Sequence, residues 1–439
     1  MKPARHSQTL RSPALAYRGA TPGTTPKEEL YCEKVALRSL ATRHGTPLYV
    51  YSAAMIRARL NAFARAFRGV PHTLCYSVKA NSTLGILRLV AGEGAGFDVV
   101  SGGELQRVLR VNRKAAEKVV FSGVGKTAAE MELALRSGIM LFNVESASEL
   151  TLLAATAARF KKPASIAIRV NPDVSAKTHP YISTGLHQHK FGVPILEAQT
   201  LYERAAKLPT LQVAGVSVHI GSQITDVGSF QEAMERVADL VRALRARDHD
   251  IRYIDAGGGL GISYEGAQGS FEKQIGAYAR AVTAPLRGLR LHLLLEPGRS
   301  IVGPSGVLLT RVLYRKTNNR KRFLIVDAAM NDMVRPSLYG AYHEIVAVVR
   351  GSREIEITDV VGPICETGDF FARDRKLSLA SEGDLLAILD VGAYGSVLGS
   401  NYNTRGRAAE VLVDGARVRV IRKRESVDDQ MRLEGVSRG

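Results

Sequence analysis

Short apolar runs alternate with helical patterns through the first two-thirds of the chain. Eight runs have the composition of buried strands, and the segments between them, such as residues 104–111 and 230–247, carry apolar residues at three- and four-residue steps. Apolar strands that each lead into a helix indicate a parallel sheet buried on both faces. This α/β pattern predicts a closed (β/α)8 barrel of the TIM type over residues 52–300. The eight runs begin at Thr73, Gly96, Lys118, Met140, Ser165, Val213, Tyr253 and Leu291.

The pattern changes after about residue 300. Segments such as RFLIVDAA and DLLAILDVG are strand-like, are separated by turn residues and show little helical periodicity. They predict a mainly antiparallel β-domain, a β-sandwich or Greek-key-like barrel, over residues 301–439. We expect a strand from residues 29–51 to complete this domain, and residues 1–28 to form a mobile leader.

Composition narrows the class of protein. The chain has 439 residues, 45% of them hydrophobic, yet no apolar run reaches the eighteen or so residues that a membrane helix needs. The first thirty residues lack the apolar core of a secretory signal. Cys32, Cys75 and Cys365 have an odd count and no metal-ligand spacing, which favours a reducing cytoplasm. We therefore predict a cytoplasmic protein without a membrane partner.

Two further features of the sequence do not predict a ligand. The formal charge of +18 is concentrated in runs such as residues 318–323 and 417–424, which lack a zinc, homeodomain or RNA-recognition signature. We interpret them as basic surface and expect no nucleic-acid partner. Three histidines at positions 179, 187 and 189 lie in a polar stretch without an acidic or cysteine ligand, so we expect a loop and no metal site.

Polar residues gather where the predicted barrel strands end. Active sites of such barrels form at the carboxyl ends of the strands. Each residue alone has an ordinary structural explanation, as when a lysine at a strand end extends its amine to solvent. Their coincidence at one rim favours an active site. The residues are Lys79, Asn81, Asp98, Ser101, Glu145, Arg169, Asn171, His219, Ser222, Gly257, Gly258, Gly259, Glu296, Gly298 and Arg299.

The types of residue at this rim suit one cofactor. The turn GGGLG, beside HIGS and EPGR, lets backbone N–H groups approach a phosphate. A desolvated lysine such as Lys79 can bond covalently to an aldehyde. A carboxylate such as Glu296 can keep a ring nitrogen protonated. Phosphate, aldehyde and ring nitrogen are the three groups of pyridoxal 5'-phosphate.

The motifs YSVKAN, FDVVSGGEL, HIGSQ, GGGLG and EPGR resemble those of the fold-type III pyridoxal-phosphate decarboxylases, a family that includes ornithine, arginine and diaminopimelate decarboxylases. The resemblance runs from about Thr46 to about Gly415. The later motifs MNDMVRPSLYGAYH, GPICETGDF and GAYGSVLGSNYNTRGRAAEVLV are most similar to the diaminopimelate decarboxylases of this family.

The resemblance implies roles at matching positions. Lys79 resembles the lysine that binds the cofactor aldehyde, His219 the residue that stacks on the ring, and Glu296 the partner of the ring nitrogen. Cys365 resembles the proton donor, which the family contributes together with Glu366 across a homodimer interface. The other expected cofactor contacts are Asp98, Arg169, Ser222, Gly257, Gly258, Gly259, Gly298, Arg299 and Tyr394.

The expected substrate follows from the charges of the remaining matched residues. An acid such as Glu366 can hold a distal ammonium group, while arginines suit bidentate binding of a carboxylate. Acid and arginines together indicate a substrate whose distal end is itself an amino acid, which is the shape of meso-diaminopimelate, with lysine as the product. The expected substrate contacts are Arg299, Arg335, Tyr339, Glu366 and Tyr394.

Other functions remain open at this point. A related decarboxylase could act on ornithine, arginine or carboxynorspermidine, and it would not need arginines at the distal end of the substrate. An amino-acid racemase shares the barrel and the cofactor but needs a second base and no Cys-Glu motif. A catalytically inactive, cofactor-binding regulator is the alternative outside the enzymes.

Overall fold

The computed structural model describes residues 14–19, 28–174, 190–265, 270–350 and 354–435. The histidine-containing stretch around residue 185 lies largely outside them. The chain divides into two compact units. The barrel unit comprises Arg57–Ile262 and Gly269–Ile301, and the β unit comprises Met1–Ile56, Ser263–Gln268 and Val302–Gly439. Among the described residues, no helix is long and apolar enough to cross a membrane.

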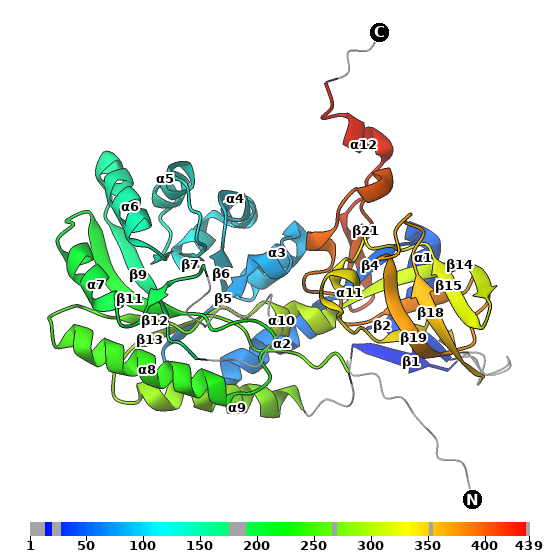
Figure 1. The fold of residues 1–439 in the computed structure, drawn as a ribbon, viewed down its shortest axis with the longest axis horizontal. Coiled ribbons are helices and arrows are strands. Elements are labelled where there is room, and N and C mark those ends of the chain that lie inside the picture. The colour runs from blue at the N-terminus through cyan, green and yellow to red at the C-terminus, as the bar shows by residue number, and fades with distance from the viewer. Residues whose placement is uncertain (1–13, 20–27, 175–189, 266–269, 351–353, 436–439) are drawn as a thin grey trace, which may run out of the picture. The chain divides into compact units, whose positions relative to one another are not determined.

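Eight parallel strands close the barrel (Figure 1). Each of the eight predicted runs forms one of them, and the circle closes where β8 pairs with β9. A short additional strand, β10 (Val193–Pro194), pairs with β9 and was not predicted. The barrel strands are β5 (His72–Ser77), β6 (Gly96–Val99), β7 (Val119–Phe121), β8 (Leu141–Val144), β9 (Ala164–Asn171), β11 (Leu211–Val218), β12 (Tyr253–Asp255) and β13 (His292–Leu295).

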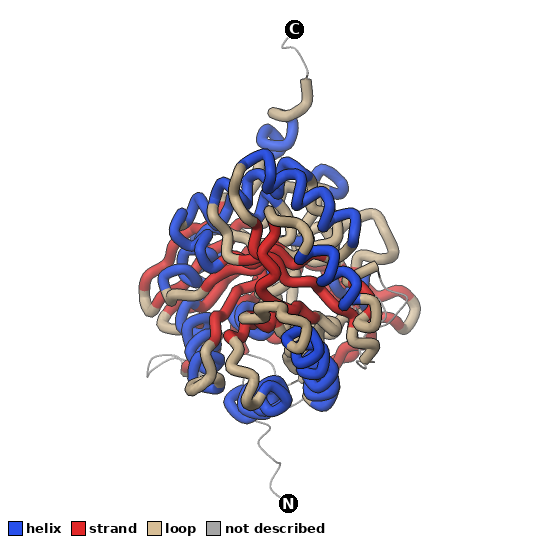
Figure 2. Tube along the Cα trace, turned by 90° about the vertical axis from the view of Figure 1, so that its left-hand side faces the viewer, coloured by secondary structure: helices blue, strands red, loops and turns tan. Residues whose placement is uncertain are grey.

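Helices surround these strands, as Figure 2 shows. Local sequence fixes where several of them begin, because Ser101, Thr127 and Ser146 each accept a backbone N–H of the following first turn. Thr127 and Glu130 form a complete capping box. The helices are α2 (Ala53–Ala66), α3 (Leu84–Gly92), α4 (Gly102–Val111), α5 (Ala128–Ser137), α6 (Ala147–Phe160), α7 (Ala198–Ala206), α8 (Gly228–Arg245), α9 (Phe271–Thr283) and α10 (Arg299–Val302).

The β unit is built on a mostly antiparallel sheet in the order β19-β18-β15-β14-β4-β21-β22. The strand β4 (Leu48–Ser52) precedes the barrel strands in the sequence. It pairs with both β14 and β21. Its apolar residues pack in the core of this unit with those of β14 and β21. The other strands of the sheet are β14 (Gly306–Asn318), β15 (Lys321–Val326), β16 (Ile345–Ala347), β18 (Ile355–Val361), β19 (Phe370–Ser378), β20 (Leu385–Ile388), β21 (Ala409–Asp414) and β22 (Arg417–Arg422).

Part of the predicted leader, residues 1–28, forms a strand of a small second sheet. The strand β1 (Leu15–Arg18) lies inside the 1–28 range and pairs antiparallel with β2 (Glu28–Cys32). Leu15 is 5% exposed and packs in the core, which fixes this segment in place. The sheet also contains β3 (Val35–Ala36) and β17 (Val349–Arg350), and the short helices of the unit are α1 (Leu37–His44), α11 (Arg335–Tyr339) and α12 (Val427–Met431).

Candidate active site

Lys79 lies in a short 3-10 turn directly after β5. Its Nζ atom is 2.7 Å from Oδ2 of Asp98, which is fully buried on β6, whereas the lysine side chain keeps 35% of its surface exposed. Ser77 also donates to Asp98 Oδ2, at 2.8 Å. The buried carboxylate of Asp98 therefore binds the amine of Lys79, and a reactant can still reach this lysine.

Glu296 lies just after β13 and forms a buried pair with Asp255, the last residue of β12. Asp255 is 0% exposed and Glu296 5% exposed. Burial, and then the charges of Asp255 and Asp98, raise the pKa of Glu296 well above its ordinary value. Burial and the neighbouring negative charges therefore favour the protonated form of Glu296.

His219 lies directly after β11. Burial lowers its pKa well below the ordinary value, and the positive charges of Arg169 and Lys79 lower it further. The imidazole is thus neutral. Its Nδ1 atom accepts the N–H of Gly258 at 3.1 Å, so the remaining ring proton lies on Nε2.

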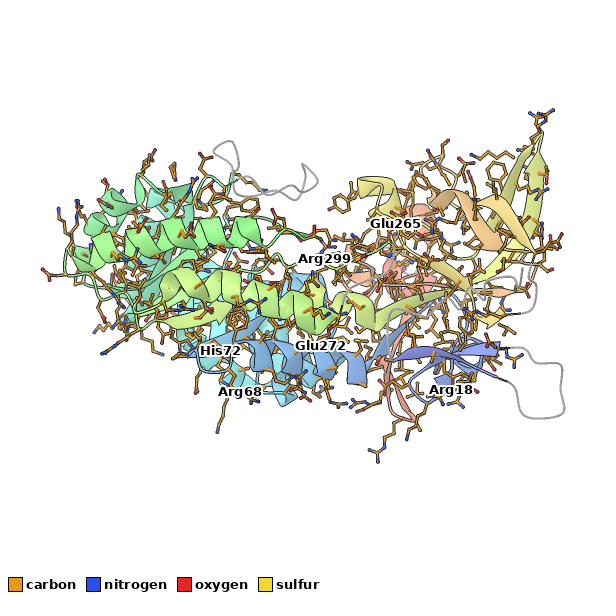
Figure 3. The ribbon with its side chains drawn as sticks, turned by 90° about the horizontal axis from the view of Figure 1, so that it is seen from below. Arg18, Arg68, His72, Glu265, Glu272 and Arg299 are labelled. Atoms are coloured by element: carbon orange, nitrogen blue, oxygen red, sulfur yellow. The ribbon has the colours of Figure 1, made fainter. Side chains whose placement is uncertain are left out.

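The glycine turn after β12 has no room for side chains. A Cβ atom on Gly258 would lie 2.2 Å from the carbonyl oxygen of Glu296, and Gly259 adopts a φ of +101°. Arg299 follows β13 (Figure 3) and donates to Ser222 Oγ at 3.0 Å. The turn, the serine and the guanidinium group form a set of donors that suits a phosphate.

Two buried ion pairs support this rim. Arg169 contacts Glu145 at 3.0 Å, and Glu145 also accepts the backbone N–H groups of Gly123 and Gly192. Lys126, with 1% of its side chain exposed, contacts Glu149 at 2.7 Å and also donates to two carbonyl oxygens. Sequence analysis placed Arg169 at the rim but missed Lys126, because a lysine ahead of a helix is usually exposed.

Replacing Lys126 with methionine is expected to lower the free energy of unfolding by about 3–5 kcal/mol, because Glu149 would stay buried without its cation. Urea denaturation measures the change. The control is Arg136→Ala, which removes an exposed ion pair with Glu132 and should cost less than about 1 kcal/mol. Equal effects of the two substitutions would contradict the structural importance of the buried pair.

The other predicted site residues lie in the β unit. Arg335 is 5% exposed, and its guanidinium group donates to the hydroxyl of Tyr264 at 2.7 Å. Cys365 is exposed, and its backbone N–H donates to Asn403. Glu366 lies beside it and is also exposed, while Tyr339 and Tyr394 are half-buried.

Within the barrel unit, the structure thus brings together Lys79, Asp98, His219 and Glu296 with the glycine turn. Sequence reasoning missed three buried residues at this place: Asp255, Asn143, which donates to Asp255, and Ser122, which donates to Glu296. The signal that could have found Asp255 and Asn143 is a polar residue near the end of an apolar strand, in YIDAGGG and LFNVES.

Comparison with known proteins places these features in a family. Residues 53–303 match the family model described as "Pyridoxal-dependent decarboxylase, pyridoxal binding domain". The chain belongs to this family, and its barrel unit is a pyridoxal-binding domain. The residues fit the cofactor, since an accessible amine, a neutral imidazole, a buried acid with a raised pKa and a glycine turn are all present.

Individual relatives indicate which kind of decarboxylase within this family the chain resembles. The chain is 54% identical over 401 residues to the diaminopimelate decarboxylase of Pseudomonas aeruginosa, covering 91% of this chain and 95% of the relative. It is 48% identical over 400 residues to that of Aquifex aeolicus, covering 91% and 94%. The solved structure of the Helicobacter pylori diaminopimelate decarboxylase complexed with L-lysine has a TM-score of 0.87 at 45% identity, covering 91% and 99% of the two chains.

Proposed function

We propose that the chain catalyses the pyridoxal-phosphate-dependent decarboxylation of meso-2,6-diaminopimelate to L-lysine and CO2, the last step of bacterial lysine biosynthesis. The observation that carries this proposal is the agreement between the barrel site and the relatives: the lysine, histidine and acid lie together in a chain that is 54% identical to a diaminopimelate decarboxylase. The experiment that tests it is parallel incubation of the purified protein with diaminopimelate, lysine, ornithine and arginine, with CO2 and product measured. Lysine formed from diaminopimelate alone is the expected result.

Within this proposal, each residue of the barrel rim has a role. When bound, pyridoxal phosphate supplies an electron-poor ring that accepts the electrons released as CO2 leaves. Lys79 would hold the cofactor covalently through its Nζ atom. Glu296 keeps a proton at the ring nitrogen, and neutral His219 offers an uncharged face for stacking. Ser222, Arg299 and the glycine turn hold the phosphate, and Asp98 orients Lys79.

The residues of the β unit complete the proposal. Cys365 delivers a proton to the α-carbon after CO2 has left, while Arg335 and Glu366 bind the distal end of the substrate. We propose that Cys365 and Glu366 act across a homodimer interface, and their exposure in this chain is consistent with that role. Tyr339 and Tyr394 are further proposed contacts. The cysteines are free, which supports a reducing compartment such as the cytoplasm.

Replacing Arg335 with lysine is expected to lower kcat/KM for meso-diaminopimelate by about 10- to 100-fold, because lysine keeps the charge but loses bidentate contact with a carboxylate. Steady-state kinetics should show most of the loss as a rise in KM. Arg417→Lys, on β22 of the same unit, is the matched control because Arg417 is exposed. An unchanged KM would exclude Arg335 from binding the substrate.

A further inference from the structure

Ser77, the last residue of β5, joins three strand ends of the barrel unit. It is 3% exposed and directly precedes the 3-10 turn that carries Lys79. Its Oγ atom lies 2.8 Å from Oδ2 of Asp98 on β6 and 2.9 Å from the carbonyl oxygen of Glu296 after β13. Its backbone N–H donates to the carbonyl oxygen of Pro297 at 3.2 Å. The hydroxyl group is therefore fixed between the carboxylate that binds the Lys79 amine and the segment that follows β13.

The direction of these hydrogen bonds follows from the number of protons. A serine hydroxyl has one proton to donate, whereas a carbonyl oxygen and an ionised carboxylate only accept. Asp98 and the carbonyl group of Glu296 therefore share the single proton of Ser77. Hydrogen bonds to a charged acceptor are roughly twice as strong as those between neutral groups, so the carboxylate of Asp98 is the preferred acceptor.

Asp98 has two side-chain donors in the described part of the barrel. The residue is fully buried, and its Oδ2 atom accepts both Ser77 and, at 2.7 Å, the Nζ atom of Lys79. Its Oδ1 atom has no hydrogen-bond partner among the residues that the structure describes. When the Lys79 amine turns away to react, Ser77 remains as the side-chain donor to Asp98. Its bond matters then, because a buried carboxylate without any donor is costly.

The same donor affects how tightly the Lys79 amine holds its proton. An ammonium group must lose a proton before its nitrogen can attack an aldehyde. A carboxylate without another donor is a stronger partner for that ammonium group, whereas a second hydrogen bond offsets part of the negative charge. Ser77 therefore makes it easier for Lys79 to lose its proton.

We propose that Ser77 is a positioning residue for Lys79, which acts through Asp98. Its hydroxyl group holds the carboxylate in place and stabilises its charge when the Lys79 amine leaves it, and it weakens the grip of the carboxylate on the proton of that amine. The consequence for catalysis rests on the function proposed above, whereas the effect of Ser77 on the amine does not.

Other titratable groups surround this pair, but the Ser77 side chain does not bind them. Within the described residues, its hydrogen bonds go to Asp98 and to a backbone carbonyl. Burial raises the pKa of Glu104, on α4, to about 7, so this group titrates in the wild type and in a Ser77 variant alike. The difference between the two proteins then reports on Ser77. The groups whose pKa depends on the charge of Asp98 or Lys79 are Cys75, Glu104, His219, Asp255 and Glu296.

The effect on the amine can be tested on the full chain freed of cofactor. Formaldehyde with cyanoborohydride methylates neutral amines, and mass spectrometry of the peptide that contains Lys79 gives the reaction rate as a function of pH. We expect Ser77→Ala to move this profile to higher pH by about one unit, which is a roughly tenfold slower reaction at a given pH below the midpoint. Ser305→Ala is the matched control, because Ser305 is also 3% exposed and donates to a backbone carbonyl. It should leave the profile unchanged.

A double-mutant cycle with Asp98→Asn shows whether Ser77 acts through Asp98. Asparagine removes the negative charge, so Asp98→Asn should move the profile to lower pH, and adding Ser77→Ala should not move it further. Ser77→Cys carries a thiol, which is a weak donor, and should shift the profile in the same direction as Ser77→Ala. It covers the case in which Ser77→Ala does not fold.

The outcomes separate this proposal from the proposed function. An unchanged profile in the Ser77 variants, or an equal shift with and without the carboxylate of Asp98, would overturn the role of Ser77. The expected shift in a protein that releases no CO2 from meso-diaminopimelate would refute the proposed function and leave the effect of Ser77 on the amine standing.

Discussion

Replacing Lys79 with alanine is expected to abolish tight cofactor binding and to reduce decarboxylation by roughly 10⁴-fold or more, because the covalent attachment of the cofactor is lost. The absorption spectrum of the purified protein and the release of CO2 from meso-diaminopimelate measure the two effects. Alanine also removes the cation beside buried Asp98, so part of the loss could reflect a destabilised barrel.

Lys79→Arg separates these effects. Arginine keeps a positive charge next to Asp98 but does not bond to an aldehyde at neutral pH. We expect the arginine variant to unfold at nearly the same urea concentration as the wild type and to be as inactive as the alanine variant. Retained turnover in either variant would show that another amine serves as the covalent attachment.

The second large effect is expected at Cys365. Replacing it with alanine should lower kcat by about 10²- to 10⁴-fold, the usual contribution of a positioned acid, while leaving the Kd for pyridoxal phosphate unchanged. Steady-state kinetics and a cofactor titration distinguish the two quantities. The split is expected because Cys365 lies in the β unit, whereas the proposed cofactor contacts other than Tyr394 lie in the barrel unit.

Cys32→Ala is the matched control for this substitution. Cys32 is buried in the core of the β unit and behaves as a small apolar residue, so its replacement should change stability more than turnover. A kcat within threefold of the wild type in Cys365→Ala would show that a different group protonates the product.

The barrel could be predicted from the sequence because each of its strands is an apolar run followed by a helical pattern, and all eight predicted runs form strands. The candidate active-site residues of the barrel were found because they lie at or directly after the ends of these runs. Resemblance to a family added the roles of Cys365 and Arg335, which no local pattern would single out.

Other features depend on contacts that are distant in sequence. Leu15 looks like part of a leader until β2 and the β-unit core are in place around it. Asn143 reads as one polar residue in an apolar strand, and only the closed barrel brings it to Asp255, which is 112 residues away. The raised pKa of Glu296 likewise depends on burial and on charged neighbours that sequence spacing does not reveal.

The position of β4 has a consequence for how the protein is made on the ribosome. This strand is synthesised before the barrel, but its partners β14 and β21 emerge only after the barrel is complete. Until then both edges of an apolar strand are unpaired, which is a condition that favours aggregation. A gene fragment that starts after the barrel would lack β4, an interior strand of the sheet. A circular permutant that begins at Val302 and joins the old termini would deliver β14, β21 and β4 together before the barrel is made.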